Sequence, residues 1–175
     1  DSNAASTILH SIGDFERIGD HAQNILESAK EMNDKIICFS PAANAELAVL
    51  SRAVLDIVER SIDAFIGDDL SLAYSVEPLE EVIDELRSEL KSRHIARLQK
   101  GLCTIELGFI FSDIITDMER IADHCSNIAL TIIQSRRHSY DTHRYINELR
   151  DSGNPEFAAM HEHYGRIYSL ADSTS

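Results

Sequence analysis

The amino-acid sequence predicts an all-α protein, and three observations support this fold class. Apolar residues recur every three or four positions along most of the chain, which is the spacing of one face of a helix. Only three prolines and seven glycines interrupt the 175 residues. Hydrophobic residues make up 43% of the chain, enough for the core of one ordinary domain.

Four long helices are predicted, and the apolar stripe of each defines its buried face. Their approximate ranges are 7–32, 41–66, 70–99 and 102–135. The first stripe comprises Ile8, Ser11, Phe15, Ile18, Ala22, Ile25, Ala29 and Met32. Because short turns join the last three helices, we expect an antiparallel three-helix bundle with the first helix as an addition.

Capping residues and helix breakers set the predicted helix ends. The pair Ser40-Pro41 reads as an N-cap followed by proline in the first turn, and Gly67 suits the end of the second helix. One residue of the pair Asp68-Asp69 is expected to cap the third helix. Pro78 is expected to bend or break that helix, and Gly101 to end it.

Both ends of the chain are expected to lie outside this helical domain of residues 5–135. Residues 1–4 look like the remnant of a cleaved expression tag. Residues 136–175 are predicted to form a helical tail, with short helices at about 142–151 and after Pro155. No signal peptide and no apolar run near ~20 residues is found, so we expect this piece to be soluble.

The formal net charge of −14 argues against nucleic acid or an anionic lipid surface as a partner, and it permits bound cations. The three cysteines, Cys38, Cys103 and Cys125, lack a metal-binding spacing. We expect them to be reduced thiols in a cytosolic compartment, with Cys125 in the core.

An internal repeat is the most specific feature of the sequence. The segment Asp14–Ile25 matches Asp117–Ile128 at an offset of 103 residues, with eight of twelve positions identical. The apolar stripe stays in phase across the same offset. The chain therefore contains the same helix from two copies of a repeated unit.

Two carboxylates of each repeat lie one helical turn apart on the outward side. In the second copy these are Glu119 and Asp123, followed by Asn127. The corresponding residues of the first copy are Glu16, Asp20 and Asn24. Like charges at this spacing repel by a few tenths of a kcal/mol, so their presence in both copies suggests a bound cation.

The predicted third helix carries a similar pair, Glu80 and Asp84. If the third and fourth helices face each other there, four carboxylates converge. Carboxylate oxygens suit hard cations such as Mg²⁺, Ca²⁺ and Mn²⁺, and also iron. The alternative is that these acidic rows are solvated helix faces.

Other identical residues of the repeat have structural interpretations. His21 and His124 could add a nitrogen ligand, although histidines at such positions usually pack between helices or face solvent. Arg17 and Arg120 are expected to pair with neighbouring acids. The two asparagines of the rows can hydrogen-bond across helices.

The segments Glu-Arg-Ile-Gly-Asp-His-x-x-Asn-Ile and Glu-Arg-Ile-Ala-Asp-His-x-x-Asn-Ile resemble the signature of PhoU proteins. The resemblance spans most of residues 7–135. It implies two similar three-helix bundles, each with the motif in its third helix, and clusters of iron, zinc or other metals that serve the control of phosphate uptake. It further implies a set of metal ligands: Glu16, Asp20, Glu119 and Asp123, with Glu80 and Asp84 as the partner motif.

The segments His94-Ile-x-Arg-Leu-x-x-Gly101, Tyr145-Ile-Asn-Glu-Leu149 and Phe157–Leu170 resemble the C-terminal end of bacterial sodium/phosphate cotransporters. That resemblance implies a regulatory domain on the cytoplasmic side of the membrane, with the membrane domain of the same transporter as its partner. The first bundle is reduced to one helix here. Its metal site therefore lacks a partner or gains one from a second chain in a homodimer.

The leading functional hypothesis is a metal-binding regulatory domain, not an enzyme, that binds phosphate through its metal. The metal could be iron, zinc, manganese, magnesium or calcium, between which carboxylates discriminate weakly. A metal-free helical interaction module is the main alternative. A di-metal carboxylate enzyme needs Glu-x-x-His in a bundle core, and this chain has none.

Overall fold

The computed structural model describes residues 2–137 and 154–171, without the side chains of residues 2–7, His10 and Arg137. Helices are the regular elements throughout this described part, which confirms the predicted all-α class. Their bounds are α1 Ser2–Lys35, α2 Pro41–Gly67, α3 Leu70–Gln99, α4 Ile105–Arg137 and α6 Pro155–Ile167. None of the described helices combines the length and hydrophobicity needed to cross a bilayer.

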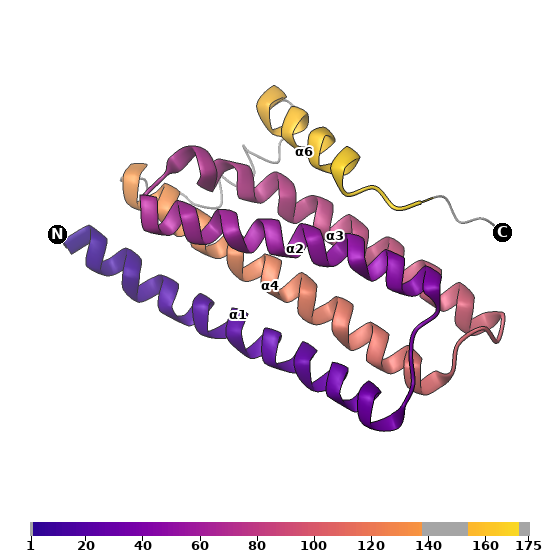
Figure 1. The fold of residues 1–175 in the computed structure, drawn as a ribbon. Helices are drawn as coiled ribbons and strands as arrows, with labels where there is room; N and C mark the ends of the chain where they lie inside the picture. Colours follow the sequence, from indigo (N-terminus) through magenta and orange to yellow (C-terminus); the bar gives the residue numbers. More distant parts are fainter. Residues whose placement is uncertain (1, 138–153, 172–175) are drawn as a thin grey trace.

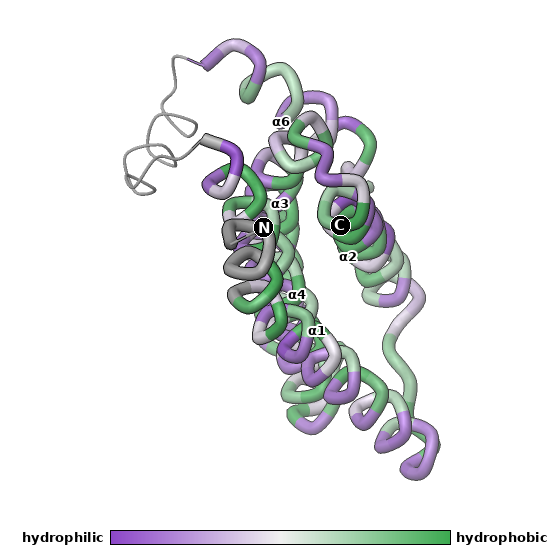
Figure 2. Tube along the Cα trace, turned by 90° about the vertical axis from the view of Figure 1, so that its left-hand side faces the viewer, coloured by the Kyte–Doolittle hydropathy of each residue, from purple (hydrophilic) through white to green (hydrophobic). Residues whose placement is uncertain are grey.

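Helices α2, α3 and α4 contact one another and form the predicted three-helix bundle (Figure 1). Helix α1 packs along α4, and α6 packs on α3. Hydrophobic and hydrophilic residues alternate along the helices, as expected for helices with one buried face (Figure 2). Among the fully buried side chains at the centre are Leu50, Ile57, Leu79, Ile83, Leu90, Phe111, Ile115 and Ile128.

Several predicted helix ends are confirmed. The Ser40 hydroxyl accepts a hydrogen bond from the backbone N–H of Ala43 at 3.2 Å, with proline at the first turn. The Asp69 carboxylate caps α3 in the same way. Gly101 has φ +67°, a conformation that glycine adopts without a steric penalty, and it follows the last turn of α3.

Other boundaries differ in detail from the prediction. Helix α3 continues through Pro78, whose ring is fully buried, so it does not break there; that Pro78 bends the helix stays a prediction. Helix α2 ends at Gly67 as predicted, and the left-handed residue that follows is Asp68, with φ 50°. Helix α4 starts at Ile105 because Thr104 acts as its N-cap, accepting from the N–H of Leu107 at 3.2 Å.

At the N-terminus α1 already begins at Ser2, earlier than the predicted residue 7. That residues 1–4 are a tag remnant stays a prediction. The predicted helix at about 142–151 lies outside the described residues.

The predicted final helix is present as α6, capped by Asn154. Tyr168 donates a hydrogen bond from its hydroxyl to Asp56 of α2 at 2.7 Å. The guanidinium of Arg60 lies 5.2 Å from the ring centre of Tyr164. These contacts attach the C-terminal helix to the bundle by polar and aromatic groups together.

All three cysteines are free thiols, as predicted. Cys125 is fully buried in the core of the bundle. Burial raises the pKa of its thiol to about 12, so it stays protonated and unreactive at neutral pH.

Candidate functional site on the repeated helices

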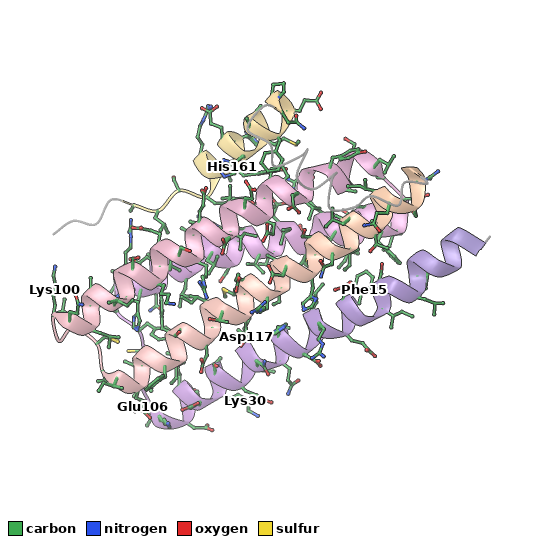
Figure 3. The ribbon with its side chains drawn as sticks, turned by 180° about the vertical axis from the view of Figure 1, so that it is seen from behind. Phe15, Lys30, Lys100, Glu106, Asp117 and His161 are labelled. Atoms are coloured by element: carbon green, nitrogen blue, oxygen red, sulfur yellow. The ribbon has the colours of Figure 1, made fainter. Side chains whose placement is uncertain are left out.

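The two copies of the repeat lie side by side in α1 and α4, running antiparallel. His21 of α1 hydrogen-bonds through Nδ1 to Asp117 of α4 at 2.7 Å, and His124 of α4 bonds to Asp14 of α1 at 2.8 Å. Figure 3 shows Asp117 on the side of α4 that faces α1. Because these four residues are repeat equivalents, the contact has an approximate two-fold symmetry.

The asparagines of the repeat complete this symmetric contact. Asn24 donates to the Asp117 carboxylate at 3.1 Å, and Asn127 donates to Asp14 at 3.2 Å. The rings of His21 and His124 stack with their centres 5.7 Å apart. The suggestion that the asparagines bond across helices is confirmed. They therefore join the two helices rather than simply extending the outward acidic rows.

The histidines also have a helix-packing role, because each ring is about one-fifth exposed and carries a carboxylate partner. Sequence reasoning did not single out Asp14 and Asp117 as their partners. The signal was present in the repeat itself, since both aspartates are identical positions seven residues before a histidine. Only the antiparallel arrangement of α1 and α4 pairs each aspartate with the histidine of the other copy.

Helix α4 packs against α3, and charges of α3 act on Glu119 of the α4 acidic row. The pKa of the Glu119 carboxyl is raised, first by burial and then by the charges of Asp123 and, more weakly, Asp84. The cations of Arg87 and Arg120 oppose this shift. Carboxylates and guanidinium groups of both helices therefore act on Glu119 with opposite signs, and burial is the largest cause of the raised pKa.

The other predicted metal ligands of this face are Glu80, Asp84 and Asp123, and they differ in burial and in their partners. Glu80 of α3 is half-buried and Asp84 is exposed. Asp123 accepts from Arg120 at 3.2 Å, which confirms that this arginine pairs with a neighbouring acid. Within the described residues, no three His, Cys, Asp or Glu side chains are gathered closely enough to hold a metal ion.

The acidic row of α1 has a different setting. Glu16 and Asp20 are exposed, and Arg17 lies 4.0 Å from Asp20. The main charges that act on Glu119 belong to Asp123 and Arg120 of α4 and to Asp84 and Arg87 of α3. These groups influence one another, although the described carboxylates are not gathered closely enough to hold an ion.

The chemistry of the α3–α4 face fits a hard cation, because its donors are carboxylates that disfavour one another's ionisation. In the structure, the guanidinium groups of Arg87 and Arg120 are the positive charges that act on Glu119. Holding an ion there requires the carboxylate side chains to rotate toward one another and the guanidinium of Arg120 to leave Asp123.

The motif His94–Gly101 has a packing role. The His94 ring stacks on Phe111 at 4.7 Å, and Arg97 makes a bidentate pair with the buried Glu46 at 3.0 and 2.8 Å. The Arg97 guanidinium also lies 5.5 Å from the centre of the Phe111 ring. The motif thereby joins α2, α3 and α4.

Comparison with known proteins finds a family and several relatives of similar sequence. Residues 47–132 match the PhoU domain family. A PhoU homologue of Thermotoga maritima, named a phosphate-specific transport system accessory protein, is 31% identical over 127 residues, covering 73% of this chain and 54% of the relative. Relatives of the same name from Pseudomonas aeruginosa and Synechocystis are 26% and 28% identical. They cover 83% and 74% of this chain, and 59% and 56% of their own lengths are matched.

No solved structure gives a significant match. The chain spans about half the length of the curated relatives it matches. Their names describe accessory proteins of a phosphate-specific transport system. The relatives are PhoU homologues and not sodium/phosphate cotransporters, so the cotransporter link stays a prediction. Residues 47–132 of this chain are therefore similar to the PhoU domain family.

Proposed function

We propose that this chain is a regulatory module of phosphate transport whose α3–α4 acidic face binds a hard metal cation. The relatives named as accessory proteins of phosphate-specific transport support the regulatory part. The metal would be held by Glu119 and Asp123 of α4 together with Glu80 and Asp84 of α3.

The observation that supports this site is the raised pKa of Glu119. Burial and the nearby carboxylates of Asp123 and Asp84 make ionised Glu119 unfavourable in the free protein. A bound cation would remove that repulsion, and oxygen ligands from two helices suit magnesium, calcium, manganese or iron. Zinc is a further candidate that the PhoU resemblance suggests.

Three finer proposals concern the transporter, the binding of phosphate and a second metal site. The sodium/phosphate cotransporter is the proposed transporter, on the resemblance of the His94–Gly101 motif, with this domain on the cytoplasmic side of the membrane. Phosphate would bind through the metal. The exposed row Glu16 and Asp20 would form a second site only when another helix, such as one from a second copy, supplies the facing carboxylates.

The test is the melting temperature of chelator-treated protein with and without added Mn²⁺, Fe²⁺, Zn²⁺, Mg²⁺ or Ca²⁺. Binding at a hundredfold excess over Kd should add about 2.7 kcal/mol. For a chain of this size that is a rise of roughly 5–10 °C. Glu119→Gln should abolish the rise, and the matched variant Glu16→Gln should retain it.

Phosphate binding is tested in the same preparations by titration calorimetry. Binding should occur with the metal-loaded protein and disappear after chelation. Phosphate binding that survives chelation would contradict the metal-mediated route while leaving the metal site intact.

A metal-free interaction module is the second candidate. It is favoured by the arginines at the site, since Arg87 and Arg120 already offset part of the negative charge. In that case no ion raises the melting temperature, and Glu119→Gln stabilises the protein under all ionic conditions.

A further inference from the structure

One end of the bundle exposes an unusual set of apolar side chains. This docking end comprises residues 27–46 and 89–109, which include the α1–α2 linker and the α3–α4 loop (Figure 1). Ile36 is 93% exposed and Ile105 is 75% exposed. The full set of large exposed apolar residues here is Ile36, Ile95, Leu102, Ile105 and Phe109. Clustered apolar exposure of this kind marks interaction surfaces.

The two loops of the docking end form one surface. Lys35, next to Ile36, reaches Glu106, next to Ile105, with 2.5 Å between Nζ and Oε1. Figure 3 shows Lys100 and Glu106 at this end of the molecule. The α1–α2 linker and the start of α4 therefore lie at the same end of the molecule, where this ion pair joins them.

A hollow of about 220 Å³ lies within this surface, between α3 and α4. Apolar side chains line most of it, among them Ile95, Leu98, Ile105 and Phe109, and the exposed Lys91 contributes to its lining. An apolar hollow beside a cationic group suits an amphiphile with a hydrocarbon part and an anionic head.

The docking end carries no net charge, although the whole chain carries −14. Its six basic residues are Lys30, Lys35, Lys91, Arg93, Arg97 and Lys100, and its six acidic residues are Glu27, Glu31, Asp34, Glu46, Glu89 and Glu106. Exposed charges more than about 8 Å away are largely screened at physiological ionic strength. The acidity that argues against an anionic lipid partner therefore belongs to the rest of the molecule.

We propose that the docking end binds the surface of a phospholipid bilayer. Leu102, Ile105 and Phe109 enter the boundary between headgroups and acyl chains, and Lys91 and Lys100 contact lipid phosphates. The apolar residues protrude from two loops and a helix end, and a fluid surface accommodates such uneven protrusions without a matching shape. The inference does not depend on the metal site.

The chain has no tryptophan, so a single introduced one reports its own surroundings. In Phe109→Trp, addition of vesicles of equal parts phosphatidylglycerol and phosphatidylethanolamine should shift the emission to the blue. Brominated acyl chains in those vesicles should quench it. Ile66→Trp is the matched control, because Ile66 is 78% exposed at the opposite end of α2, and its emission should not change.

A second variant keeps the test independent of that reporter. Leu102→Ser combined with Ile105→Ser alters only exposed positions, so the helical circular dichroism should be unchanged. Vesicle co-sedimentation should fall about tenfold or more. Lys91→Gln with Lys100→Gln should weaken binding to the phosphatidylglycerol vesicles more than binding to phosphatidylcholine vesicles.

Three outcomes would overturn the proposal. One is no spectral change at position 109 with any vesicle, and another is an equal change at position 66. The third is a blue shift at position 109 that grows with protein concentration in the absence of lipid, which would assign the surface to a second copy of the chain.

Discussion

Helices α1 and α4 share one motif, yet they are buried to very different degrees. Ile115 of α4 is 1% exposed, and its repeat equivalent Ile12 of α1 is 47% exposed. Phe111 of α4 is fully buried, and its equivalent Ile8 is 52% exposed. The reason is that α4 is packed by α1, α2 and α3, whereas α1 packs mainly along α4.

The comparison separates the identical residues of the repeat into two groups. Asp, His and Asn at equivalent positions join α1 to α4, and they have the same partners in both copies. The Glu and Asp of the acidic rows depend on a further helix. In the described part of the chain, α3 lies beside the α4 row. The first group thus explains the contact, and the second group remains available for function.

The largest expected difference concerns the apolar equivalents. Ile115→Ala should lower the free energy of unfolding by about 2–4 kcal/mol, because it leaves a cavity in the core. Ile12→Ala should cost well under about 1 kcal/mol, because the side chain is half exposed. Urea unfolding measures both. Equal costs would show that the exposed face of α1 is covered in solution.

The symmetric contact between α1 and α4 predicts that equivalent substitutions in the two helices lower stability by similar amounts. Asp14→Ala and Asp117→Ala each remove an acceptor that serves one histidine and one asparagine, so each should cost about 1–3 kcal/mol. The two losses should agree closely, because the environments are equivalent. A double-mutant cycle between His21 and Asp117 should give a coupling energy near 1 kcal/mol. A large inequality between the aspartates would contradict the two-fold arrangement.

A smaller, pH-dependent effect should distinguish the acidic rows in metal-free protein. Since the folded state raises the pKa of Glu119, the protonated carboxyl contributes stability at low pH, and this contribution is lost as pH rises through the folded pKa. Glu119→Gln should therefore stabilise the protein by a few tenths of a kcal/mol at neutral pH, after allowance for solvent screening. Near pH 4 the difference should vanish. Melting curves across this range check it, with Glu16→Gln as the control.

The smallest expected changes in stability are those for substitution of Arg17 and Arg120. Arg120 lies 3.2 Å from Asp123, and Arg17 lies 4.0 Å from Asp20. Exposed pairs of this kind contribute about 0–1 kcal/mol. Arg120→Ala should cost at most about 0.5 kcal/mol in metal-free protein, and Arg17→Ala should have no measurable effect on urea unfolding. A larger loss for Arg17→Ala would indicate a partner for α1 in solution.

Helix periodicity predicted the four long helices and most of the buried faces, because a helix that packs on one side must repeat its apolar residues at helical spacing. The local rule against proline allowed a break at Pro78, and the helix continues there with the ring buried in the core. Helix periodicity also placed Ile8 in a buried stripe, although that side chain is 52% exposed.

The sequence by itself determined the helices, their caps, the repeat and the candidate carboxylates, since each depends on residues close together in the chain. Only the tertiary structure decided that α1 runs antiparallel to α4, that His21 therefore meets Asp117, and that α3 adds its charge to one acidic row and not the other. These are contacts between residues far apart in the sequence, and no local spacing specifies which helix lies beside which.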